Sequence, residues 1–290
     1  MKLRFFGYAI FVVFCVCIAG YRHFPGDTAS TYIQHALTKF NPNLSIDITK
    51  IKPAFPPGIK TEPLVINYAG IPLIGLEKFK LGVDLLSVFS DERRFPFKGV
   101  TKGGTLSGSI TSQGDKEGQI LLESEFKTLV FDRLNLGKHL YDLQLSGTLT
   151  GKIAGRMDQQ KLKTGQGNIN IENVLFDLGS LDFWMDEIAF SSVAVMFTLP
   201  DPGTLKIESC HMKGNQLDLE SSGEIKIAPL FENSRLNLAV SILLHPRFFM
   251  EAGNSIPAEM AKGNSDGTKL DVTIQGTLQN PKIKMLQEKQ

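Results

Sequence analysis

Long stretches of this chain alternate apolar and polar residues with a period of two. The alternation runs through residues 141–153, 217–227, 236–244 and 270–278. A period of two places every second side chain on the same face of a β-strand, so each strand has one apolar and one polar face. Such strands are typical of an antiparallel sheet with one side in water. The chain is therefore predicted to be mainly β, a long antiparallel meander that forms a curved sheet or a sandwich.

The apolar positions of these strands are the candidate lining of a groove or a core. Alternation shows which side chains share the inner face, and it leaves open whether they meet a second sheet or an open groove. The candidate residues are Leu143, Leu145, Leu219, Ile225, Leu238 and Val240.

The N-terminus has a different pattern, because residues 5–21 carry no charge and follow Lys2 and Arg4. As a helix, this segment is just long enough to cross the hydrocarbon core of a bilayer. Residues 1–24 are predicted to be a single-pass signal anchor with a cytoplasmic N-terminus. The alternative is a cleaved signal peptide, since Cys17 and Ala19 are small residues that suit a signal peptidase. The candidate anchor residues are Phe5, Phe11, Val12, Phe14, Ile18 and Tyr21.

A helical period follows the anchor. Residues 27–40 are predicted to form an amphipathic helix that either lies on the membrane surface or packs on the β domain. Residues 83–89 and 247–261 are also predicted to be helical and to cover an open end or an edge of the sheet. With no long linker in the chain, residues 25–290 are predicted to be one β-rich domain. Breaks typical of hairpins lie at residues 112–115, 163–165, 201–203, 213–215 and 264–267.

Composition narrows the possible functions. The formal net charge is +1, so the chain has no electrostatic footprint for nucleic acid. Cys15 and Cys17 lie in the predicted anchor, which leaves Cys210 without an intramolecular disulfide partner in the exported part. Cys210 stands beside His211 and could be a reactive thiol, but a small buried hydrophobe is the more ordinary role of a lone cysteine in a strand.

A Gly-Thr-Leu sequence recurs along the chain, at Gly104, at Gly147 and at Gly276. In the first two copies a second glycine follows four residues later. Glycine inside a strand costs stability, so this recurrence indicates bends, bulges or close packing at equivalent places of a repeated unit. Chance recurrence in a glycine-rich β chain is the alternative.

Together these segments resemble a known family. The apolar N-terminal segment, Phe24-Pro25-Gly26, Pro56-Pro57-Gly58, the Gly-Thr-Leu segments, Gly165-Gln166-Gly167 and Ser222-Gly223-Glu224-Ile225 occur in an order and spacing similar to those of the type II secretion system protein N (GspN) family. The resemblance covers nearly the whole chain. The closing Gly276-Thr277-Leu278 followed by Pro281 also resembles AsmA-like proteins, whose repeated β segments form curved, apolar-lined sheets at bacterial membranes.

The resemblance implies a single-pass protein of the Gram-negative inner membrane, with its β domain in the periplasm. It implies a non-catalytic scaffold or assembly partner of the other type II secretion subunits. The AsmA-like ending implies the alternative, a lipid-binding or lipid-transport protein that holds phospholipid in an apolar β groove.

The sequence offers no catalytic or metal-binding pattern. The histidines lack His-Glu-x-x-His spacing, no Cys-x-x-Cys pair is present, and no Gly-x-Ser-x-Gly elbow appears. Carboxylates at Asp182, Asp186 and Glu187 flank Trp184, but such clusters are usually solvated edges. We therefore expect no enzymatic activity, no cofactor and no metal.

Overall fold

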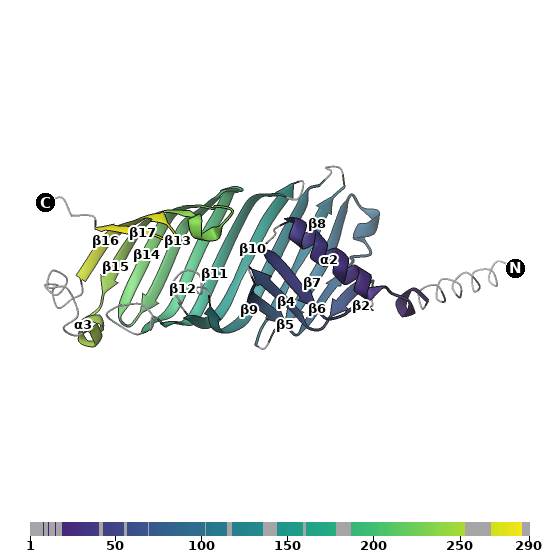
Figure 1. The fold of residues 1–290 in the computed structure, drawn as a ribbon, viewed down its shortest axis with the longest axis horizontal. Helices are drawn as coiled ribbons and strands as arrows, with labels where there is room; N and C mark the ends of the chain where they lie inside the picture. The colour runs from purple at the N-terminus through teal and green to yellow at the C-terminus, as the bar shows by residue number, and fades with distance from the viewer. Residues whose placement is uncertain are drawn as a thin grey trace.

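The long strands pair with their sequence neighbours into one extended sheet. The structure is a computed structural model, and it describes residues 8, 11, 15, 19–40, 43–54, 57–68, 70–101, 103–114, 118–135, 144–158, 161–177, 187–252 and 268–285. Its fourteen-stranded sheet has the order β17-β16-β15-β14-β13-β12-β11-β10-β9-β8-β7-β6-β3-β2, and a separate three-stranded sheet has the order β1-β4-β5. The strands lie side by side along the long axis of the molecule (Figure 1).

Each described strand pairs antiparallel with its neighbours, as the alternating pattern predicts. The small sheet consists of β1 (Leu44–Ile48), β4 (Leu64–Tyr68) and β5 (Ile71–Leu76). The N-terminal strands of the long sheet are β2 (Ile51–Ala54), β3 (Gly58–Thr61), β6 (Lys78–Gly82), β7 (Glu92–Val100), β8 (Thr105–Gln113) and β9 (Ile120–Asn135). Its remaining strands are β10 (Gln144–Asp158), β11 (Lys161–Asp177), β12 (Glu187–Asp201), β13 (Thr204–Gly214), β14 (Leu217–Lys226), β15 (Arg235–Leu244), β16 (Thr268–Thr277) and β17 (Pro281–Met285).

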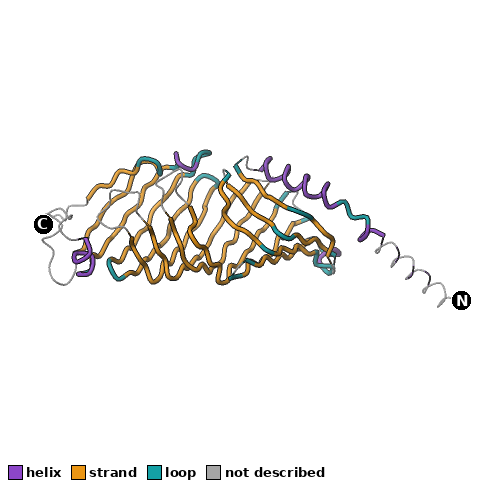
Figure 2. Tube along the Cα trace, turned by 60° about the horizontal axis from the view of Figure 1, so that its bottom comes forward, coloured by secondary structure: helices purple, strands orange, loops and turns teal. Residues whose placement is uncertain are grey.

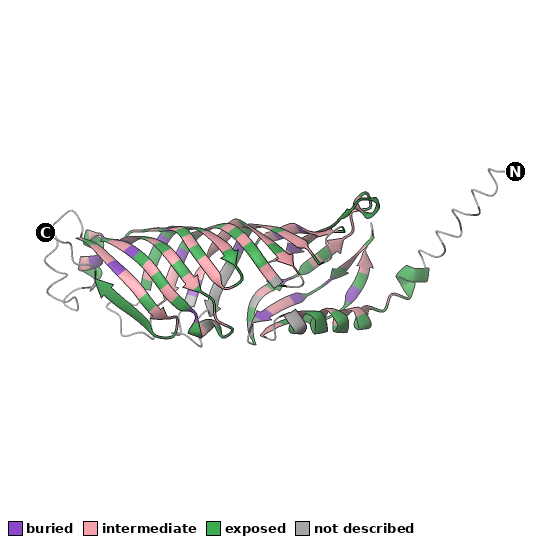
Figure 3. Ribbon diagram, turned by 90° about the horizontal axis from the view of Figure 1, so that it is seen from above, coloured by how far each residue is buried: buried purple, intermediate pink, exposed green. Residues whose placement is uncertain are grey.

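The long sheet twists and curves along its length (Figure 2). This agrees with the right-handed twist that accumulates from strand to strand in large sheets. Along many of the strands, buried or half-buried residues alternate with exposed ones (Figure 3). Strand β13, for example, has fully or partly buried residues at every second position over most of its length. The fold is therefore the curved sheet of the prediction, and its second sheet is small.

Helix α2 (Gly26–Phe40) confirms the predicted amphipathic helix. It contacts β1 and β2, and the Gln34 side-chain amide donates a hydrogen bond to the Ile46 carbonyl at 3.2 Å. Ile33 and Leu37 are partly buried on this side. Gly26 lies so close to the Ile51 carbonyl that a Cβ at position 26 would collide with it. Of the two placements that the sequence left open, the helix thus takes the one on the β domain.

The N-terminal apolar segment lies mostly outside the described residues. Phe5, Val12, Phe14 and Ile18 of the predicted anchor are not described, whereas Phe11 and Tyr21 are described and exposed. Among the helices of the described ranges, none has the length and apolar character needed to cross a bilayer.

Two sequence predictions need correction. Residues 163–165 were predicted to be a hairpin break, but they lie within β11, and the strand change comes earlier, where Asp158 pairs with Lys161. Gly165 pairs with Gly155 on β10 and with Leu199 on β12. The residue therefore lies between packed strands and does not form a turn. Residues 83–89 were predicted to be helical, but they form turns and a single 3₁₀ turn, η1 (Ser87–Phe89).

The other predicted breaks and helices fall as follows. Hairpin turns follow β8, β12 and β13 as predicted, and residues 264–267 lie outside the description. Helix α3 (Pro246–Ala252) confirms the beginning of the predicted 247–261 helix, and the rest of that segment is not described. A second 3₁₀ turn, η2 (Phe231–Asn233), precedes β15.

Candidate functional site: the apolar face of the long sheet

The strand register aligns apolar and small side chains into continuous rows across all fourteen strands. Directly paired residues of antiparallel strands point to the same face, so each row follows from the pairing. Neither of two adjacent rows contains a charged residue. The first row is Ile51, Thr61, Phe79, Gly99, Leu106, Phe126, Gly151, Ile169, Val195, Cys210, Ser221, Val240, Val272 and Met285.

The second row lies two residues along each strand from the first, except on β13, where a register shift makes the step from Cys210 to Ile207 three residues. It is again free of charge, and it is made of Pro53, Ile59, Leu81, Phe97, Gly108, Ser124, Ile153, Gly167, Phe197, Ile207, Gly223, Leu238, Ile274 and Ile283. Together the two rows form an apolar band that runs from one end of the sheet to the other. We call the face that carries it the inner face.

The opposite face is polar. The row between the two apolar rows begins with Lys52, Lys60, Lys80 and Lys98 and continues through Ser107, Glu125, Lys152 and Asn168. Glu125 pairs with Lys127 and Lys152 at 3.2 and 3.6 Å, and the Lys127 ammonium is the main cause that lowers the pKa of Glu125. The sheet therefore has one charged face in water and one face on which the two adjacent rows carry no charge.

Glycines in the rows make room for large neighbours. The Phe197 ring lies over Gly167, where a Cβ would collide with it, and Phe97 lies over Gly108 in the same way. In the repeated segment, Gly147 and Gly151 stand at the two register shifts between β10 and β9. This confirms the prediction of bulges for that copy of the repeat.

The small sheet covers the inner face at the N-terminal end. Leu64, Leu76 and Leu106 form a buried cluster that Phe79, Phe97 and Phe126 extend. Leu76 lies directly over Gly99 of the first row, since a Cβ at Gly99 would be 3.0 Å from its Cδ1 atom. Strands β6 to β9 are thus part of a closed two-layer core.

The inner face of β10 to β17 has a different environment. The described residues packed against it from outside the sheet belong to α3, whose Phe248 is 2% exposed and joins Leu217, Leu244 and Phe190 at one margin. Away from that margin, the second-row residues Ile153, Phe197, Ile207, Leu238 and Ile274 are only partly buried. At the far end, Ile283 and Met285 are 67% and 59% exposed. In the described part of the chain, the band is therefore covered at one end and only partly buried over the rest.

Helix α3 is fixed to the margin by polar contacts. The Gln216 side chain accepts a hydrogen bond from the Ala189 amide at 3.1 Å and donates one to Glu251 at 2.6 Å. Glu251 also accepts a hydrogen bond from Arg247 at 2.6 Å. These two donors, Gln216 first, lower the pKa of Glu251. The charged form of Glu251 therefore holds the helix that closes the apolar band along one side.

The structure brings the described candidate lining residues onto the inner face. Leu145 and Val240 are buried, Leu219, Ile225 and Leu238 are partly buried, and Leu143 lies outside the described residues. The sequence reading missed Phe197 on β12. The reason is a register shift between Phe190 and Ser192, which breaks the period of two in that strand. The apolar residues on either side of the shift were the signal in the sequence that could have predicted this strand and its inner face.

Cys210 is a member of the first row and is buried. Burial raises the pKa of its thiol, and the neighbouring Ser221 opposes that effect less strongly. A raised pKa leaves little thiolate at neutral pH, so the geometry gives Cys210 the role of a small buried hydrophobe.

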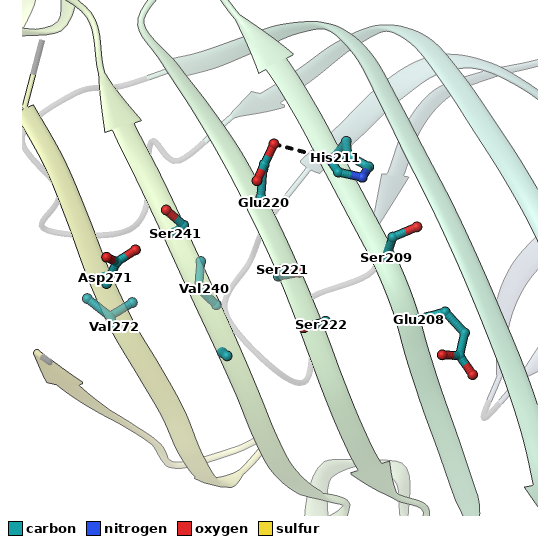
Figure 4. Close-up of a pocket in the computed structure, with 11 residues that line it drawn as sticks. Glu208, Ser209, His211, Glu220, Ser221, Ser222, Val240, Ser241, Asp271 and Val272 are labelled. Carbon is teal, nitrogen blue, oxygen red and sulfur yellow. Dashed lines mark ion pairs between the residues drawn. The ribbon is translucent and has the colours of Figure 1, made fainter.

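The polar face carries a shallow hollow of about 460 Å³. Its floor includes the short side chains of Ser209, Ser222 and Ser241, and its rim carries an ion pair between His211 Nδ1 and Glu220 Oε1 at 3.4 Å (Figure 4). Short side chains on a curved sheet are sufficient to produce such a depression, so the hollow does not by itself indicate a ligand site. Within the described part of the chain, no three His, Cys, Asp or Glu side chains are placed to hold a metal ion.

Comparisons of the chain with protein-family models, with curated proteins and with solved structures give no match.

Proposed function

We propose that this protein binds lipid acyl chains along the open part of its inner face. The observation that supports this proposal is the uncharged apolar band. The band continues from the closed core onto strands β10 to β17, where its second row is only partly buried. A large, continuous, partly exposed apolar surface usually marks a site that binds a ligand or a partner.

The dimensions suit an acyl chain. Eight strands at about 4.8 Å spacing extend roughly 34 Å along the band, against roughly 15 Å for the acyl chains of one leaflet. Each methylene transferred from water contributes about 0.8 kcal/mol. The band would therefore hold a phospholipid by its chains, with the headgroup directed to water. This is the activity implied by the resemblance to AsmA-like proteins.

The test uses the full-length protein purified from its native membrane in mild detergent, with bound lipids counted by native mass spectrometry. Leu238 and Ala239 are adjacent on β15, with Leu238 on the inner face and Ala239 exposed on the outer face. We expect stoichiometric phospholipid on the wild type and on Ala239→Asp, and its loss from Leu238→Asp. Wild type without stoichiometric lipid, or equal retention by both variants, would refute lipid binding in the band.

A second candidate function rests on the free edge of the sheet. In strand β17 all five residues are exposed. One side of the strand pairs with β16, and no other described strand pairs with its second side. An exposed edge offers main-chain groups to a further strand. Through it the protein could dock other type II secretion subunits as a scaffold in the inner membrane, as the resemblance to the GspN family implies.

The same preparation tests this candidate when bound proteins are identified beside the lipids. Recovery of secretion subunits from the wild type, and their loss when Ile283→Pro disrupts the edge strand, would support the scaffold. A preparation that contains lipid and no secretion subunits would count against it.

A further inference from the structure

The turn between β6 and β7 presents large apolar side chains to solvent. Leu86 and Phe89 are 85% and 93% exposed, and Leu85 and Val88 are 52% and 46% exposed. Four such side chains within residues 85–89 form a contiguous apolar patch. Isolated exposed hydrophobes are ordinary, but a group of this kind on one tip indicates a contact surface.

Hydrogen bonds hold the turn so that these side chains point outward. The Asp84 carboxylate accepts a hydrogen bond from the Leu86 amide at 3.1 Å, and the Asp84 carbonyl accepts one from the Ser87 hydroxyl at 2.7 Å. That hydroxyl in turn accepts one from the Arg94 amide at 2.9 Å. The polar residues of the turn are thus used internally, which leaves the apolar residues for the outside.

A cationic surface adjoins the tip. Lys52, Lys60, Lys80 and Lys98 form one row across the polar faces of β2, β3, β6 and β7, and all four are exposed. Arg94 lies on the same face of β7 as Lys98, four residues nearer to the tip. Asp91 and Glu92 also lie near the tip, and Gln113 donates a hydrogen bond to Glu92 at 3.3 Å. Beyond them the face is basic, which complements an anionic bilayer surface.

The tip lies at the end of the molecule where residues 19–25 lead into helix α2. The sheet order places β6 and β7 toward the β2 end, and η1 and the described residues 19–25 lie at the same end of the long axis (Figures 1 and 2). Residues 19–21 are the last of the uncharged residues 5–21. A bilayer that contacts residues 19–21 would therefore meet the tip as well.

We propose that residues 85–89 insert into the boundary between headgroups and acyl chains of an anionic bilayer and hold this end of the sheet against the membrane. We take the contact to be with lipid because the side chains protrude rather than line a hollow, and because the neighbouring face is basic. This contact is independent of lipid binding along the inner face, and either can fail without the other.

The test places the full-length chain in bilayers of phosphatidylethanolamine and phosphatidylglycerol that contain no other protein. The bilayers are prepared with and without bromine on the acyl chains. The chain has one tryptophan, Trp184, so Trp184→Phe gives a background in which Phe89→Trp is the sole reporter. Met250→Trp, on α3 at the other end of the sheet, is the matched control, since Met250 is 74% exposed. Leu86→Trp serves as a second reporter if Phe89→Trp does not fold.

We expect blue-shifted emission and strong quenching by brominated chains for Trp at 89, and neither for Trp at 250. Quenching at 89 should decrease when phosphatidylglycerol is omitted and when Arg94 and Lys98 are both changed to Glu. The proposal would be overturned if the emission of Trp at position 89 matched that of the control and were still quenched by aqueous iodide. A blue shift that requires added membrane proteins would overturn it in favour of a protein partner.

Discussion

The two ends of the inner face have the same composition and different surroundings. Around Phe97 the small sheet covers the band, and Leu76 is 1% exposed. Around Leu238 the band has no such layer among the described residues, and the side chain is partly buried. Both regions derive from the same alternation. The pattern of a strand therefore determines which face is apolar, while the layer opposite determines whether that face is a buried core or stays partly exposed.

The largest expected difference between the two regions is in stability. Leu76→Ala in the covered region should lower the free energy of unfolding by about 3 kcal/mol, because it leaves a cavity in a closed core. Leu238→Ala in the open region should cost about 1 kcal/mol or less, because its side chain is already partly solvated. Urea denaturation of the full chain in mild detergent, followed by far-UV circular dichroism, measures both. Equal losses would show that the two regions are packed alike.

A smaller difference should separate two glycines of the second row. A Cβ at Gly108 would collide with the Glu123 carbonyl, which is backbone, whereas at Gly167 it would meet the Phe197 ring. Gly108→Ala should therefore cost about 2 kcal/mol, and Gly167→Ala less, because a ring in the open region can move aside. Gly75→Ala, with no atom near its Cβ, is the control. The same urea titration distinguishes them, and a larger loss at Gly167 would contradict an open region.

The smallest effect concerns the margin closed by α3. The pKa of Glu251 is lowered in the folded protein, so its charge stabilises the fold above the pKa of the unfolded chain. That contribution is lost as the pH falls through the lower folded value. The wild type should therefore lose slightly more stability than Glu251→Gln between neutral pH and pH values below 4.5, the ordinary value for glutamate. Urea midpoints at several pH values check this, and identical pH dependence would argue against the role of Glu251.

Much of the fold could be predicted because period-two alternation is a local property of each strand. Strands β14, β15 and β16 and helix α2 lie where the sequence placed them. The cover formed by β1, β4 and β5 could not be predicted, because it depends on contacts between short strands and distant ones. In residues 83–89 the apolar run suggested a helix. Asp84 and Ser87, which hydrogen-bond within the turn, were the signal that it is an exposed tip.

The central claim is that the open region of the inner face contacts acyl chains in the native membrane. Site-specific photo-crosslinking tests it most directly, with a photoreactive residue placed at Leu238 or at its outward-facing neighbour Ala239 in the full-length protein, in cells grown with radiolabelled phospholipid. The account predicts a labelled lipid adduct from position 238 and none from position 239. Equal labelling at both positions, or none at position 238, would contradict it.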